Sequence, residues 1–239
     1  ASQCGAKVAK HGNRSATRSS GSADLLEQAG VPLTLKPTEV ADCIKNIGLG
    51  FMFAPAHHSA MKHVVGPRKE IAQKSIFNVL GPLTNPASAK RQVMGVYDKK
   101  WMGPITNVLK ELGSEHTMII HSEDGLDEIS IASPTFVIEM KDGDISEYTI
   151  SPEDFNFKTS TLNGLRVDSP EESLNLVKLA LVDKHQEASS MISMAAGAAL
   201  YVSEVSSSLE AGILLANECV KDGGGIEKLN QLVEYTSKF

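Results

Sequence analysis

Residues 92–120 read QVMGVYDKKWMGPITNVLKELGSEHTMII, in which strand-like and helix-like patterns of apolar residues follow one another. The run from Gln92 to Tyr97 predicts a strand, and the run from Thr117 to Ile120 predicts a second, buried strand. Between them lies a helical stripe that ends at Gly113, with apolar members at Ile105, Val108, Leu109 and Leu112. Alternation of strands with helices is typical of an α/β sandwich, here with a mixed sheet.

On the C-terminal side of this stretch, the sequence predicts a hairpin and then helices. The runs from Thr135 to Met140 and from Ile145 to Ile150 flank the turn Lys141-Asp142-Gly143-Asp144. From Ser169 onward the apolar spacing is mostly helical, and it includes a long helix rich in small residues from Ala188 to Val202.

On the N-terminal side, the sequence predicts short helices around one apolar run. A helix is expected to begin at the N-cap Thr38 and to stop at Gly48. The run from Phe51 to Pro55 fits either a short strand or an apolar loop, and its aromatic residues are expected in the core. Other helices are predicted at Leu25 to Gln28, at about Ser59 to Val64, and at Arg68 to Gln73.

The composition excludes several classes of protein. The formal net charge of −6 argues against a broad surface for nucleic acid or membrane, and no apolar run approaches the roughly 20 residues that cross a bilayer. The three cysteines are widely spaced and match no metal-ligand pattern, and the first residues lack signal-peptide character. We therefore expect a cytoplasmic protein that binds neither nucleic acid nor membrane.

Residues 10–24, KHGNRSATRSSGSAD, combine the features of a phosphate-binding segment. Lysine and arginine supply positive charge, serine and threonine supply hydroxyls, and the two glycines let the backbone approach a ligand closely. The final Ser-Gly-Ser-Ala-Asp is expected to open a helix, whose free amides favour phosphate. Composition alone leaves a solvated turn with an N-cap serine as the alternative.

With this segment the chain resembles the anthranilate phosphoribosyltransferases, which carry Lys-His-Gly-Asn-Arg followed at the same spacing by Ser-Gly-Ser-Ala-Asp. The resemblance implies transfer of the 5-phosphoribosyl group from phosphoribosyl pyrophosphate (PRPP) to anthranilate in tryptophan biosynthesis. It also implies a fold of the nucleoside phosphorylase and class III phosphoribosyltransferase type, with a mixed, largely parallel central sheet flanked by helices and part of a smaller helical domain. The residues that it places at PRPP are Lys10, His11, Gly12, Asn13, Arg14, Ser15, Ala16, Thr17, Arg18 and Ser22.

Anthranilate is expected to meet Arg68, since a guanidinium group matches a benzoate carboxylate in two parallel hydrogen bonds. The resemblance implies this role for Arg68, places His58 at the entrance for anthranilate, and lets Asn13 reach the aromatic substrate. A metal site is not predicted at the neighbouring histidines, because their spacing matches no zinc pattern; they are His57, His58 and His63.

A third segment, HSEDGLDEIS at residues 121–130, directly follows the strand predicted at Thr117 to Ile120. Adjacent carboxylates on a loop at the end of a strand suit Mg²⁺, which prefers oxygen ligands and bridges to substrate phosphates. An acidic turn is the alternative. The resemblance assigns magnesium binding to Asp127 and Glu128, whereas Glu123 and Asp124 are expected to be solvated charges.

Members of the family carry a Gly-Thr-Gly-Gly-Asp loop upstream of the phosphate segment, and no part of this sequence matches it. We therefore expect an N-terminally incomplete chain with little or no turnover by itself. One large α/β phosphoribosyltransferase domain is expected over residues 1–239, with a helical segment at about 36–75 that contributes to the smaller helical domain. A homodimer is expected of the full-length protein, and no dedicated catalytic nucleophile is required.

Two other functions stay open at this point. A nucleoside phosphorylase of related architecture also cleaves at an anomeric carbon beside a phosphate site, but it is not expected to share the context of Arg68 or the acidic pair. A truncated or non-catalytic paralogue would keep the fold and bind a nucleotide, a nucleic acid or a protein partner. A strongly basic surface would favour nucleic acid, and the net charge of −6 does not.

Overall fold

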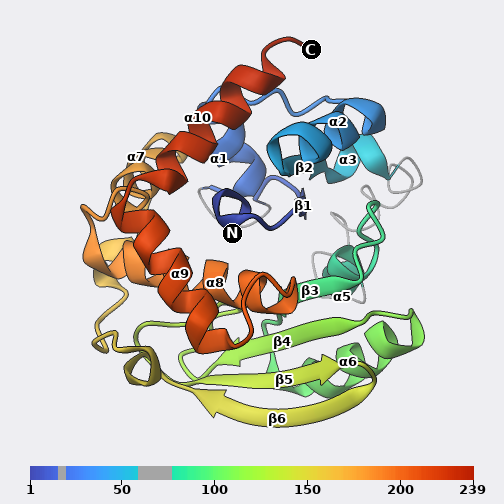
Figure 1. Ribbon diagram of the computed structural model, residues 1–239, viewed down its shortest axis with the longest axis vertical. Coiled ribbons are helices and arrows are strands. Elements are labelled where there is room, and N and C mark those ends of the chain that lie inside the picture. The colour runs from blue at the N-terminus through green and yellow to red at the C-terminus, as the bar shows by residue number, and fades with distance from the viewer. Residues whose placement is uncertain (16–19, 59–76) are drawn as a thin grey trace. The chain divides into compact units, whose positions relative to one another are not determined.

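The computed structural model describes residues 1–15, 20–58 and 77–239, except for the side chains of residues 77–79 (Figure 1). The chain divides into two compact units. Unit 1 comprises residues 1–6, 89–166 and 175–228, and unit 2 comprises residues 7–88, 167–174 and 229–239. That the segment at about 36–75 contributes to a smaller helical domain stays a prediction. The helices expected within residues 59–76 lie outside the described residues.

The main feature of unit 1 is a four-stranded sheet with the order β3-β4-β5-β6. Strand β3 (Arg91–Gly95) runs parallel to β4 (His116–Ser122), because helix α6 (Met102–Glu111) returns the chain to the same end of the sheet. Strands β5 (Thr135–Lys141) and β6 (Asp144–Ile150) are added antiparallel and form the predicted hairpin, whose turn contains Gly143 at φ 92°. The strand, hairpin and mixed-sheet predictions for this unit are confirmed.

Helices pack on the sheet of unit 1 through alternate residues of its strands. Met118 and Ile120 of β4 belong to a core that also contains Met194 of α8 (Gln186–Val202) and Ile213 of α9 (Leu209–Lys221). Ile119 points to the other side of the strand, where α6 packs on β4 and β5. Only part of the predicted stripe on α6 is buried: Ile105 and Leu109 are covered, whereas Val108 and Leu112 are 42% and 56% exposed.

Unit 2 contains a two-stranded parallel sheet of β1 (Val8–Gly12) and β2 (Leu49–Phe53). Helix α2 (Pro37–Ile47) buries Val40, Cys43 and Ile47 in a core that includes Leu232. The predicted N-cap at Thr38 is wrong: Lys36 is the N-cap, because Pro37 already has the φ angle of the first helical turn. The predicted end at Gly48 is confirmed, with φ at 75°.

The remaining described elements are short or lie in the C-terminal part of the chain. The α-helices among them are α1 (Ser22–Gln28), α3 (Ala54–His57), α5 (Phe77–Leu83), α7 (Pro170–Ala180) and α10 (Gly224–Thr236). The short 3-10 helices, labelled η, are η1 (Ser2–Cys4), η3 (Lys99–Trp101), η4 (Pro152–Phe155) and η5 (Asn163–Leu165). Among the described residues, the mixed α/β class is thus confirmed, with one parallel and one mixed sheet. No helix in the described ranges is both long and apolar enough to cross a membrane.

Candidate functional site

The predicted phosphate segment begins on β1 and continues to the start of α1, both in unit 2. A Cβ atom added to Gly12 would lie 2.5 Å from Oγ of Ser22 and 3.0 Å from the ring of Phe51. Only glycine therefore lets the Ser22 hydroxyl approach the end of β1. The structure thus brings together the two halves of the segment that the sequence predicted to bind one ligand.

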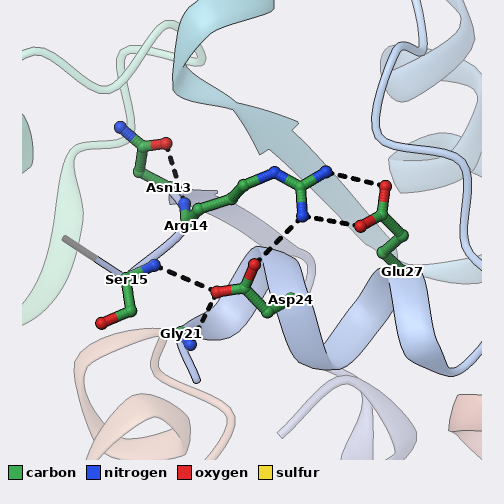
Figure 2. A network of polar contacts seen from close by, with 6 residues as sticks. All are labelled: Asn13, Arg14, Ser15, Gly21, Asp24 and Glu27. Carbon is green, nitrogen blue, oxygen red and sulfur yellow. Dashed lines mark hydrogen bonds and ion pairs between the residues drawn. The ribbon is translucent and has the colours of Figure 1, made fainter. Parts of the chain in front are cut away.

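The carboxylate of Asp24 connects the two ends of the loop between β1 and α1 (Figure 2). Its Oδ2 atom accepts hydrogen bonds from the backbone amides of Ser15 at 3.0 Å and Gly21 at 2.9 Å. Arg14 donates to Oδ1 of the same carboxylate at 3.0 Å, and to both oxygens of Glu27 at 2.6 and 2.7 Å. Asp24 and Glu27 were not predicted as site residues, although Asp24 at the third position of a helix is typical of a capping box.

These contacts favour the ionised forms of two carboxylates, those of Asp24 and Glu27. Burial acts to raise the pKa of Asp24, but the amides of Ser15 and Gly21 and the guanidinium of Arg14 outweigh it, so that the pKa lies below its usual value. The hydrogen bond from Arg14 likewise lowers the pKa of Glu27. Both carboxylates are therefore ionised at neutral pH, and the guanidinium of Arg14 faces two negative charges.

Two histidines meet beside this loop. The Nε2 atoms of His11 and His58 are 3.1 Å apart, and the rings pack edge to face with centroids 4.8 Å apart. Burial, followed by the proximity of His58, lowers the pKa of His11. At this distance one of the two nitrogens donates a hydrogen bond and the other accepts it. His11 and His58, which were predicted as residues of two different substrate sites, are therefore in direct contact, and His58 reaches the phosphate segment.

The predicted magnesium ligands Asp127 and Glu128 lie in unit 1, in the turn that follows β4. Both side chains are exposed. A Cβ atom added to Gly95 at the end of β3 would lie 1.6 Å from the carbonyl oxygen of Asp127, so the backbone of Asp127 lies directly against β3. The buried hydroxyl of Ser122 donates to the carbonyl oxygen of Glu128 at 2.5 Å. The backbone of the acidic pair is thus held at two points.

The same turn contains a second set of hydrogen bonds, centred on Asp124. Its carboxylate accepts from the hydroxyl of Ser130 at 2.6 Å and from the amide of Leu126 at 3.1 Å. The hydroxyl of Thr135 lies 2.7 Å from that of Ser122 and accepts from the amide of Ser130 at 3.2 Å. Asp124 is exposed, as expected of a solvated charge, but its carboxylate also closes the turn.

Asp127 and Glu128 place two exposed carboxylates in this turn, which could hold a cation that prefers oxygen ligands. Among the described residues, no group of three or more histidine, cysteine or acidic side chains is arranged to hold a metal ion. Two exposed carboxylates on a fixed backbone suit Mg²⁺, because this ion keeps several waters and takes its other ligands from substrate phosphates.

Ala16, Thr17, Arg18 and Arg68 lie outside the described residues, so their roles stay predictions. Lys10 and Asn13 are exposed, and the side-chain oxygen of Asn13 accepts from the amide of Arg14 at 2.8 Å.

Comparisons with known proteins agree on one family. The model of the "Glycosyl transferase family, a/b domain" matches residues 1–226. An anthranilate phosphoribosyltransferase of Ectopseudomonas mendocina is 54% identical over 239 residues, which cover 98% of this chain and 69% of the relative. Another, of Hydrogenovibrio crunogenus, is 51% identical over 100% of this chain and 70% of its own length.

Solved structures give the same result. The anthranilate phosphoribosyltransferase of Thermus thermophilus superimposes with a TM-score of 0.92 at 36% identity, over 99% of this chain and 70% of that one. The Saccharomyces cerevisiae enzyme in complex with PRPP and Mg superimposes with a TM-score of 0.87 at 26% identity, over 100% of this chain and 68% of that one.

Proposed function

Because this chain belongs to the anthranilate phosphoribosyltransferase family, we propose that it transfers the 5-phosphoribosyl group of PRPP to the amine of anthranilate in tryptophan biosynthesis. The products are N-(5-phosphoribosyl)anthranilate and pyrophosphate. The observation that supports this function most strongly is the 54% identity to an anthranilate phosphoribosyltransferase over 98% of the chain.

The chemistry requires a new bond from nitrogen to the anomeric carbon of the ribose and loss of the bond from that carbon to pyrophosphate. The aromatic amine is uncharged near neutral pH and loses one proton after attack, so a strong base is not required. Positive charge builds on the sugar while the leaving group departs. The protein therefore acts through positioning and charge stabilisation rather than through a nucleophile of its own.

We assign the phosphates of PRPP to the segment from Lys10 to Arg18 together with Ser22. The contact of Gly12 with Ser22 supports this assignment, because it joins the two halves of the segment. For anthranilate we propose Asn13, His58 and Arg68. The contact between His58 and His11 supports the place of His58 beside the phosphate segment.

For the metal we propose Asp127 and Glu128 as ligands of Mg²⁺. When bound, the ion would supply positive charge that stabilises pyrophosphate as a leaving group. Gly95 and Ser122 hold the backbone of the two residues in place, which supports this assignment. We also propose that the full-length protein is a cytoplasmic homodimer; the three free cysteines support a reducing compartment.

The replacement Lys10→Ala tests the phosphate assignment. Charged hydrogen bonds contribute about 1.5–3 kcal/mol, so we expect the dissociation constant of PRPP in the presence of Mg²⁺ to rise by roughly tenfold or more. Isothermal titration calorimetry measures this change. The matched control is Lys7→Ala, which removes an exposed lysine just before β1 and is expected to leave the dissociation constant within about twofold. Equal effects of the two replacements would contradict the assignment.

A further inference from the structure

Both ends of the loop between β1 and α1 are hydrogen-bonded to a single carboxylate oxygen. The amides of Ser15 and Gly21 donate to Oδ2 of Asp24 (Figure 2). The amide of Ala23 also lies 3.4 Å from the carbonyl oxygen of Asn13. A Cβ atom added to Gly21 would lie 2.6 Å from the nitrogen of Ser15, so the two ends meet closely. Asp24 therefore sets the separation of the loop ends.

The positive charge of the Arg14 guanidinium is already paired with the carboxylates of Asp24 and Glu27. Its guanidinium binds Glu27 through two parallel hydrogen bonds, at 2.6 and 2.7 Å, and binds Asp24 through a third at 3.0 Å. One positive charge thus faces two negative charges. A phosphate that approached this guanidinium would meet both carboxylates at close range, which disfavours direct contact.

We propose that Arg14 and Asp24 are positioning residues for the phosphate segment, and that Arg14 acts through Asp24 rather than by contacting the phosphates of PRPP. This inference rests on the proposed function of the segment and revises the part of Arg14, which the resemblance places in contact with PRPP. Arg14 holds the carboxylate of Asp24 in the orientation in which it accepts both loop amides. Glu27 holds the other side of the guanidinium in a bidentate pair. The contacts to PRPP are left to other groups of the segment, among them Lys10 and Ser22.

The direction of the Glu27→Gln effect separates the two roles of Arg14. If Arg14 contacted phosphate directly, removal of the Glu27 charge would free the guanidinium and tighten PRPP binding. If Arg14 is a positioning residue, the same replacement loosens its hold on Asp24. We then expect the dissociation constant of PRPP, measured by calorimetry with Mg²⁺, to stay unchanged or to rise by up to about threefold. Tighter binding by Glu27→Gln would overturn the proposal.

A double-mutant cycle gives a second test. We expect Asp24→Asn and Arg14→Gln each to weaken PRPP binding by about tenfold, and the double variant to bind within about twofold of the weaker single variant. Such non-additivity is expected because the two residues act as one unit. Fully additive effects would mean that Arg14 has its own contact with PRPP, and the proposal would be wrong.

Amide hydrogen exchange tests the positioning without any ligand. In both Asp24→Asn and Arg14→Gln we expect faster exchange at the amides of Ser15 and Gly21, by at least about tenfold in Asp24→Asn, with unchanged exchange in β4 of the other unit. Unchanged exchange at both amides in Asp24→Asn would overturn the proposal even if PRPP binds. Faster exchange in a chain that binds no PRPP would instead support the positioning and reject the proposed function.

Discussion

Replacement of Gly95 with alanine is expected to weaken the magnesium-dependent binding of PRPP by about 10- to 100-fold, the range seen when residues that orient metal ligands are lost. The added Cβ atom would lie 1.6 Å from the carbonyl oxygen of Asp127 and 2.6 Å from its carbonyl carbon. Because both atoms belong to the backbone, no side-chain rotation can relieve the overlap. The turn must move away from β3 and take its two carboxylates with it.

Gly103→Ala is the matched control for this prediction. Gly103 lies in α6 of the same unit, and a Cβ atom there would meet nothing within 4 Å. Calorimetry with PRPP, with and without Mg²⁺, should show magnesium dependence in the wild-type chain and in Gly103→Ala, and should show little in Gly95→Ala. Undiminished magnesium dependence in Gly95→Ala would mean that the position of the Asp127 backbone does not matter for the metal.

Replacement of Glu139 with alanine is expected to lower the free energy of unfolding by about 3–5 kcal/mol, because each hydrogen-bonding group left without a partner costs about 1–3 kcal/mol. Glu139 is 8% exposed and accepts hydrogen bonds from the hydroxyls of Tyr148 and Tyr201, at 2.6 and 2.8 Å. Its third partner is the Nε2 atom of His116, 2.8 Å away. The residue His116 is itself only 1% exposed. The replacement would leave all three groups without this acceptor. Urea unfolding followed by circular dichroism measures the loss.

The variant Glu139→Gln tests how the stability that this network provides depends on pH. Burial acts to raise the pKa of Glu139, but the hydrogen bonds from Tyr148, Tyr201 and His116 outweigh it and lower the pKa below its usual value. The stabilisation is therefore complete above the pKa of the unfolded chain and is lost as the pH falls through the lower, folded value. In acid, the stability of Glu139→Gln should thus decline less steeply than that of the wild-type chain. Parallel declines, or a loss below about 1 kcal/mol in Glu139→Ala, would contradict this account.

The sequence predicted best the features that depend on local spacing. The strands, the hairpin around Gly143 and the helix that ends at Gly48 follow from apolar periodicity and from glycines that adopt positive φ. The N-cap of α2 was misplaced by two residues because Pro37, not the side chain of Thr38, determines the first turn. The exposure of Val108 is a property of what packs against α6, which periodicity alone does not give.

Sequence alone predicted those parts of the candidate site whose residues are neighbours in the chain. The acidic pair and the phosphate segment are continuous motifs, so their residue types were visible. The contact of Gly95 with Asp127 joins positions that are far apart in the chain, and nothing in the sequence around Gly95 marks it as different from other glycines. The neutralisation of Arg14 by Glu27 was missed for a related reason, because it depends on the direction of α1 after the loop.

Calorimetric titration of the chain with PRPP, with and without Mg²⁺, tests the central claim most directly. The variants are Asp127→Ala/Glu128→Ala and, as a control, Glu123→Ala, which removes an exposed carboxylate of the same segment. The account predicts that Mg²⁺ strengthens PRPP binding by at least about tenfold in the wild-type chain and in Glu123→Ala, and that this gain is lost in the double variant. Equal binding with and without Mg²⁺ in the wild-type chain, or an undiminished gain in the double variant, would contradict it.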